Sequence, residues 1–200
     1  SDGQPVTAHD SVYSYTLARD PDTAKYGGYT PYLEDRTASY AATDDLTIVW
    51  TGVPGFRDEE YFLRFWTPLP RHAWSGYTPR ELPELDEVIR TPLGYGPYVI
   101  DEWVPGSRIE AHRNENYFRA AEGLPYFDRL VFRFVEGKDA LDKLESGQCD
   151  VLTLDTYLEN QLERVRELEG EGKLRLYSVA GLVWEHLTFG INSAPDYQRP

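Results

Sequence analysis

The segment from 98 to 112 restricts the fold more than any other part of this sequence. Two runs rich in β-branched and aromatic residues, 98–103 and 108–112, flank the dipeptide Pro105-Gly106. Proline presets the backbone of one turn residue and glycine accepts positive φ at the next, so the second run folds back on the first. A third run, 128–135, has the same β-forming composition. The sequence therefore predicts a hairpin followed by a third strand.

Helical signals occur on both sides of this block. Thr7 followed by Asp10 is a variant of the capping box, so a helix is expected at 8–19. The other expected elements are helices at 59–66, 81–90, 139–146 and 155–169, a hairpin within 33–53, a surface loop at 21–31, and closing strands at 173–179 and 182–191. The helix at 155–169 is predicted from an apolar stripe of Leu158, Leu162, Val165 and Leu168.

The order of these elements indicates the fold class. Helices that alternate with strands of mixed connection imply layered α/β packing, and they argue against a helical bundle or a β-sandwich. Residues 75–85 are rich in glycine, proline and polar residues, and they are the expected boundary between two lobes. The sequence therefore predicts a mixed α/β (α+β) chain.

The charge of the chain limits its partners. Twenty basic groups against 34 acidic groups give a net charge of -14. This charge would repel a phosphate backbone, so nucleic acid is not an expected partner. It also opposes docking on an anionic bilayer, and no apolar run reaches the length of about 18 residues that crosses a membrane.

Few residues suggest covalent or metal chemistry. Cys149 is the only cysteine, and in the stretch 147–151 it resembles a small buried hydrophobe at the start of a strand. A nucleophilic role is the alternative, but no adjacent base is visible. The histidines are scattered without a close pair, so no metal site is expected. We expect no catalytic residue and no cofactor.

The segment 91–98, Thr-Pro-Leu-Gly-Tyr-Gly-Pro-Tyr, resembles the signature of family 5 of the extracellular solute-binding proteins, the dipeptide, oligopeptide and nickel receptors. The family usually has threonine where Tyr95 stands. Further partial matches follow in the family's order at 6–12, 42–47, 69–74, 102–106, 113–118, 141–151 and 184–192. Because these matches occur in order, the chain resembles an internal fragment of this family.

The resemblance implies a periplasmic-binding-protein-like type II lobe with an attached small subdomain, both incomplete. By this analogy residues 1–80 belong to the small subdomain, 86–178 to the first main lobe, and 179–200 to the hinge strand and the start of the second lobe. The implied function is that of the substrate-binding component of an ABC-type importer. It would capture a peptide or similar small solute and deliver it to membrane permease subunits.

The resemblance also implies a location and an assembly state. The protein would be periplasmic or a cell-surface lipoprotein, with its signal and anchor outside these residues. When intact it would be a monomer.

Five residues are the candidate ligand contacts. A glycine-rich turn lets the backbone approach a ligand closely, so Tyr95 and Gly96 are expected at the site, although strained glycine dihedrals in a tight connection would explain the turn equally well. Alternation over 184–189 places Trp184, His186 and Thr188 on one face of a strand. The family analogy directs that face toward the cleft, and a hinge strand buried on both faces is the alternative.

Two other functions are compatible with parts of the sequence. A secreted hydrolase could use a cleft carboxylate pair among the 34 acidic residues or the lone cysteine. The chain has no nucleophile elbow, zincin helix or phosphate loop that would favour this function. A sensor or adaptor subunit could also use the same fold without transport.

Overall fold

The computed structural model describes residues 1–24, 35–153, 156 and 158–178. The chain separates into two compact units, Ser1–Phe134 and a second that starts at Val135. The lobe assignment 1–80, 86–178 and 179–200 refers to the intact receptor and stays a prediction.

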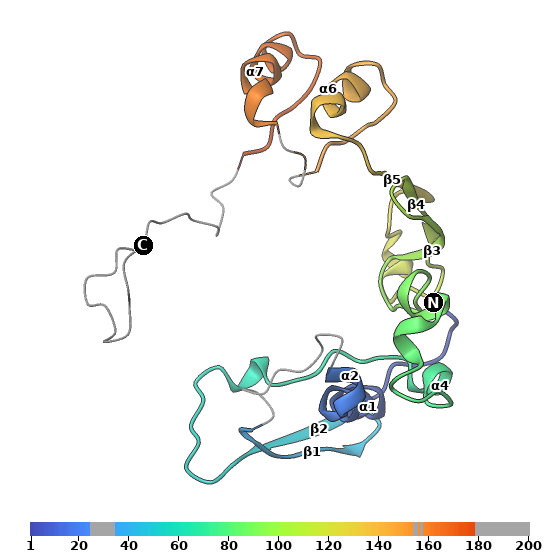
Figure 1. Ribbon diagram of the computed structural model, residues 1–200, viewed down its shortest axis with the longest axis vertical. Coiled ribbons are helices and arrows are strands. Elements are labelled where there is room, and N and C mark those ends of the chain that lie inside the picture. Colours follow the sequence, from blue (N-terminus) through green and yellow to red (C-terminus); the bar gives the residue numbers. More distant parts are fainter. Residues whose placement is uncertain (25–34, 154–155, 157, 179–200) are drawn as a thin grey trace, which may run out of the picture. The chain divides into compact units, whose positions relative to one another are not determined.

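The first unit begins with a helix that packs on a hairpin. Helix α1 (Ala8–Arg19) has the predicted bounds, and α2 (Pro21–Ala24) follows it directly. Strands β1 (Thr37–Asp44) and β2 (Thr47–Gly52) pair antiparallel, as predicted, and α1 lies against them (Figure 1). The loop predicted at 21–31 is wrong at its start, because Pro21 begins the helical turn α2. Proline suits the first position of a helix, where its missing N–H would have no partner within the helix.

The connection from β2 to the next sheet contains only short helical pieces. They are η1 (Tyr61–Leu63), α4 (Arg71–Trp74), η2 (Leu82–Glu84) and α5 (Asp86–Ile89). The predicted helix at 81–90 is wrong as a single element, because the backbone is extended at Leu85. This break allows Leu82, Leu85 and Val88 to pack in one cluster with Leu17 and Trp74. Burial of apolar surface outweighs the helix-forming tendency of the segment.

The predicted helix at 59–66 is also wrong. Only the single turn η1 forms, and its three side chains are exposed. The residues after it form no regular element up to α4, and side chains of α1 bind their backbone groups. Those tertiary hydrogen bonds replace the ones that a longer helix would have made.

The three-stranded sheet confirms the most restrictive sequence prediction. Strands β3 (Tyr98–Val104), β4 (Arg108–Arg113) and β5 (Arg129–Arg133) pair antiparallel in that order. Gly106 has φ of +71°, so it takes the turn conformation expected after Pro105. A short turn, η3 (Ala120–Glu122), connects β4 to β5.

The second unit contains α6 (Gly137–Glu145), η4 (Glu159–Gln161) and α7 (Leu162–Gly170). Leu141, Val165 and Leu168 form its core, and Leu158 packs against it. The predicted stripe is confirmed at Leu158, Val165 and Leu168 but not at Leu162, which is 43% exposed. The predicted helix at 155–169 is shorter than expected, because 159–161 form a 3₁₀ turn before α7. Residues 173–178 pair with no strand in the described part of the chain, and the strand expected at 182–191 lies outside it.

Cys149 does not match its expected setting. It is half-buried and lies in no strand, and its N–H donates to the Lys143 carbonyl at 3.1 Å. The turn that ends α6 at Gly147 holds it there, so the helix terminus and not a sheet determines its place.

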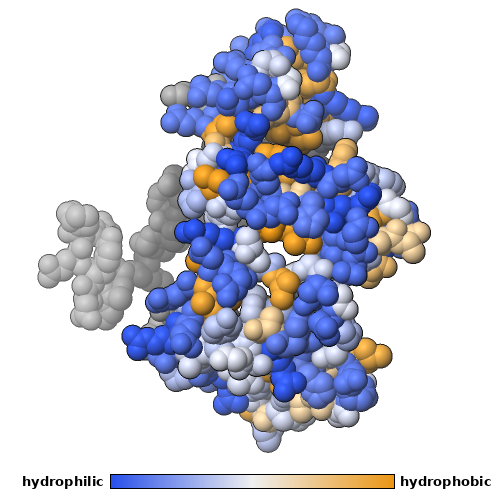
Figure 2. Space-filling view, turned by 90° about the vertical axis from the view of Figure 1, so that its right-hand side faces the viewer, coloured by the Kyte–Doolittle hydropathy of each residue, from blue (hydrophilic) through white to orange (hydrophobic). Residues whose placement is uncertain are grey.

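One face of the protein is mainly hydrophilic. On the face shown in Figure 2, hydrophilic residues cover most of the area and apolar residues form separate patches between them. Within the described residues, no helix combines the length and apolarity needed to cross a membrane.

Candidate ligand-binding pocket

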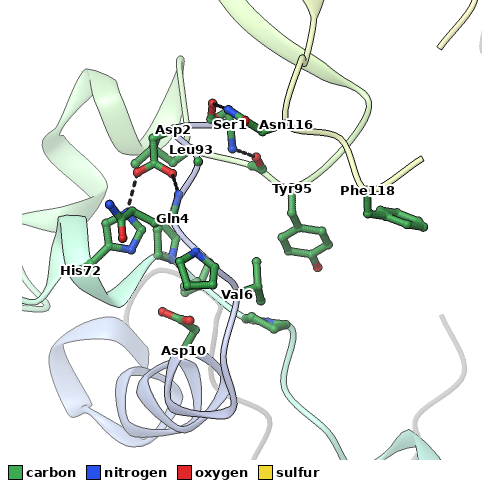
Figure 3. Close-up of a pocket in the computed structure, with 16 residues that line it drawn as sticks. Ser1, Asp2, Gln4, Val6, Asp10, His72, Leu93, Tyr95, Asn116 and Phe118 are labelled. Carbon is green, nitrogen blue, oxygen red and sulfur yellow. Dashed lines mark hydrogen bonds and ion pairs between the residues drawn. The ribbon is translucent and has the colours of Figure 1, made fainter. Parts of the chain in front are cut away.

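A pocket with a volume of about 610 Å³ lies within the first unit. One wall is the strap, defined here as residues 1–6, which precedes α1 (Figure 3). The other lining residues are Asp10, the segment 68–70, His72, the turn 93–95, Asn116 and Phe118. The volume lies within the range of about 300–1,000 Å³ that is typical of small-molecule sites.

The strap is held by side chains from two other segments. The Asp2 carboxylate and Nε2 of His72 lie 2.7 Å apart, and Asn116 donates from Nδ2 to the Ser1 carbonyl at 2.9 Å. The hydrogen bond with His72 lowers the pKa of Asp2, and the Gln4 N–H, which donates to the same carboxylate at 3.1 Å, adds to the effect. These contacts join the strap to α4 and to the turn after β4.

Asp10 lies at the base of the pocket with its carboxylate fully engaged. One oxygen accepts from the Thr7 N–H at 2.7 Å, as the capping box predicts, and it also accepts from the Thr7 hydroxyl at 2.9 Å. The other oxygen accepts from the Arg71 N–H at 3.1 Å, at the start of α4. This last bond spans 61 residues of sequence, and no local pattern indicates it. Asp10 therefore supports both helix starts from a buried position.

The structure places Tyr95 in the pocket wall and Gly96 behind it. Tyr95 is 48% exposed and lines the pocket together with Gly94, whereas Gly96 does not line it. Neither glycine has positive φ, and a Cβ at either would meet no close neighbour. Strained dihedrals therefore do not explain the glycines of this turn.

Asn114 is the residue that the sequence analysis did not single out. Its side chain is 2% exposed, and Nδ2 donates to the Gly96 carbonyl at 2.8 Å while Oδ1 accepts from the Asn116 N–H at 3.0 Å. Asn114 therefore holds the Tyr95 turn against the segment that carries Phe118. The local signal in the sequence is an asparagine shortly after an expected strand. This signal does not reveal a partner 18 residues away.

The remaining predicted contacts, Trp184, His186 and Thr188, lie outside the described residues. Their position relative to Tyr95 stays a prediction. Among the residues that the structure describes, no group of three or more His, Cys, Asp or Glu side chains could hold a metal ion.

Comparison with known proteins identifies the family. The family model for bacterial extracellular solute-binding proteins, family 5 Middle, matches residues 1–196. The chain belongs to this family. Oligopeptide-binding protein AppA of Bacillus subtilis is 25% identical over 153 residues, which is 74% of this chain and 27% of AppA. Periplasmic oligopeptide-binding protein OppA of Salmonella typhimurium is 27% identical over 188 residues, which is 86% of this chain and 33% of OppA.

Solved structures of family 5 proteins confirm the predicted mixed α/β fold. The AppA structure in complex with a nonapeptide superposes with a TM-score of 0.61 at 25% identity, covering 74% of this chain and 28% of AppA. HbpA2 from Haemophilus parasuis superposes with a TM-score of 0.60 at 17% identity, and the match covers 85% of this chain and 34% of HbpA2. The chain thus corresponds to roughly a quarter to a third of the relatives it matches.

Proposed function

We propose that the intact protein is the substrate-binding component of an ABC-type importer, which captures a peptide or a similar small solute outside the cytoplasmic membrane. The observation that carries this proposal is the family 5 match over residues 1–196, supported by the likeness to AppA, whose structure holds a nonapeptide. In this role the protein binds its ligand, closes around it, and presents the closed form to membrane permease subunits.

Binding without chemical change is part of the proposal. The family consists of solute-binding proteins, and the carboxylates and the imidazole of the described pocket are engaged with protein partners. Asp10 caps α1, and Asp2 pairs with His72, so each has a structural role that does not require turnover.

The location, partners and remaining contacts follow from the same family membership. We place the intact protein in the periplasm or on the cell surface as a lipoprotein, as a monomer that does not bind nucleic acid. We also propose that Trp184, His186 and Thr188 join Tyr95 and the Gly96 turn in binding the solute.

Calorimetry on the full-length protein would test the proposal. The protein is titrated with peptides of two to nine residues, with oligosaccharides and with metal chelates, and the bound ligand is recovered and analysed. We expect saturable binding of at least one peptide class, with the ligand recovered intact. If the protein binds none of these solute classes, or if the recovered ligand is cleaved, the proposed function is contradicted.

A further inference from the structure

The charged groups of the described pocket are already paired with the protein. Asp10 accepts three hydrogen bonds, from Thr7 and from the Arg71 N–H, and Asp2 is paired with His72. No lysine or arginine is among the residues that line the pocket. The other basic groups of the lining, the Ser1 amino group and His72, are bound to the Gly94 carbonyl and to Asp2. An anionic group entering the pocket would therefore meet two carboxylates and no basic group without a protein partner, so negative charge is disfavoured.

The rest of the lining is mainly apolar and aromatic. Val6, Leu69 and Leu93 contribute aliphatic surface, and Tyr95 and Phe118 contribute two rings. In Figure 3 the Tyr95 ring lies between Val6 and Phe118, while Asp2 and His72 lie to the other side of the strap. In this view the Tyr95 and Phe118 rings therefore lie apart from the Asp2–His72 pair.

Both rings are open to solvent, and each is carried by a segment that other residues support. Phe118 is 78% exposed, and its ring contacts the Tyr117 ring edge to face with centroids 4.7 Å apart. The turn that carries Tyr95 is bound to the Asn114 side chain. Exposed aromatic rings on supported backbone are typical of binding surfaces, because contact with a guest removes their apolar area from water at little conformational cost.

We infer that this pocket takes one uncharged apolar side chain of the ligand, aliphatic or aromatic, which packs against Tyr95 and Phe118. The inference rests on the proposed peptide-binding function and adds a selectivity to it. A glutamate side chain at the same position is rejected by the two carboxylates. A lysine side chain binds more weakly than phenylalanine, because the carboxylates already have partners and the apolar walls remove water from its charge.

The test uses the full-length protein and a positional scan of alanine peptides in which one residue at a time is Phe, Leu, Lys or Glu. We expect one position where Phe and Leu bind more tightly than Lys, and where Glu binds most weakly. At that position Phe118→Ala should weaken binding of the Phe peptide by about twofold to tenfold, the range expected for a lost aromatic contact. The all-alanine peptide should be unaffected.

Tyr126→Ala is the matched control, because this ring is 81% exposed on the same unit and does not line the pocket. It should leave the affinity for every peptide unchanged. Because Phe118 is so exposed, its truncation should also leave the melting temperature unchanged, which separates a binding effect from misfolding.

A second probe addresses the pocket directly. Crystals of the full-length protein are soaked with N-acetylphenylalaninamide, and we expect density against Tyr95 and Phe118. Three results would overturn this inference and leave the proposed function standing. The first is peptide affinity that does not change with Phe118→Ala, and the second is a Glu peptide that binds as tightly as the Phe peptide. The third is ligand density that occurs only outside this pocket. A wild-type protein that binds no peptide would instead remove the proposed function.

Discussion

Three buried polar residues of α1, Asp10, Ser11 and Ser14, bind the backbone of the segment 66–71. The Ser14 hydroxyl donates to the Thr67 carbonyl at 2.7 Å and accepts from the Leu69 N–H at 3.0 Å. These side chains replace the backbone partners that a strand or helix would supply. Single residues on one helix therefore determine the path of a segment more than 50 residues away.

Replacing Ser14 by alanine should lower the free energy of unfolding by about 1–3 kcal/mol, because two part-buried hydrogen bonds to the backbone are lost, each contributing about 0.5–1.5 kcal/mol. Urea unfolding of the two proteins measures the difference. Thr16→Ala is the control on the same helix, since Thr16 is exposed and its hydroxyl bonds only to Val12 of the same helix. A loss as large for Thr16→Ala would contradict the tertiary role of Ser14.

Tyr13 packs against the core cluster of Leu17, Trp74 and Leu82, and its buried hydroxyl has no hydrogen-bond partner among the described residues. Burial raises the pKa of this phenol. Tyr13→Phe removes an unsatisfied polar group, so it should stabilise the protein by about 1 kcal/mol in thermal unfolding.

Tyr15→Phe is the comparison for this change. The Tyr15 hydroxyl accepts from Arg19 at 3.0 Å, so its removal should destabilise the protein slightly. Destabilisation by both substitutions would show that the Tyr13 hydroxyl has a partner in solution.

At the scale of elements, the connection between β2 and α4 shows how an irregular segment is held without secondary structure. The Asp58 carboxylate accepts from the Arg64 guanidinium, and it also accepts from the Glu60 N–H at 3.0 Å. The two ionic side chains are largely shielded from solvent. The Arg64 guanidinium, with a smaller contribution from the Glu60 N–H, holds the pKa of Asp58 below its usual range.

Because the folded-state pKa of Asp58 is lowered, its stabilising contribution is present above the ordinary aspartate pKa of about 3.9 and is lost as the pH falls through the lower folded-state value. Asp58→Asn should therefore be less stable than the parent protein at neutral pH. The difference should shrink on acidification to about pH 3 or below. Urea midpoints measured across this range give the result.

Glu59→Gln serves as the neighbouring control, because Glu59 is exposed. It should change the urea midpoint little at any pH. A difference between parent and Asp58→Asn that stays constant with pH would contradict the ionic explanation and favour a steric one.

At the scale of the whole molecule, each compact unit has a core of its own. The first contains the cluster of Leu17, Trp74 and Leu82, and the second contains Leu141, Val165 and Leu168. Packing defects in one core should therefore be felt mainly within that unit.

Leu168→Ala should destabilise the second unit by about 2–5 kcal/mol, because this side chain is 0% exposed and its removal leaves a cavity. Hydrogen exchange should accelerate in α6 and α7 and remain unchanged in α1 and β3 to β5. Leu162→Ala, at a 43% exposed position of the same helix, should have little effect. Equal acceleration across both units would show that they unfold as one.

The local parts of the fold could be predicted because their causes are local. The capping box of α1 and the turn at Pro105-Gly106 use residues within a few positions of each other, so the sequence contains the full signal. The helices predicted at 59–66 and 81–90 were wrong because tertiary contacts hold these segments: Ser11 of α1 binds the Trp66 carbonyl, and Leu82 packs with Leu17 of α1 and Trp74 of α4. Helical pattern over eight to ten residues is too weak to oppose such contacts.

By itself, the sequence determined the family, the mixed α/β class and the two antiparallel hairpins. Tyr95 as a ligand contact stays a prediction. Only the tertiary structure decided which residues surround Tyr95. The strap, Asp10, His72 and Phe118 line the same pocket as Tyr95 although they lie as many as 94 positions from it in the sequence, and Asn114 binds the turn that carries Tyr95. Contacts at such separation depend on how the elements pack, and one-dimensional patterns do not record packing.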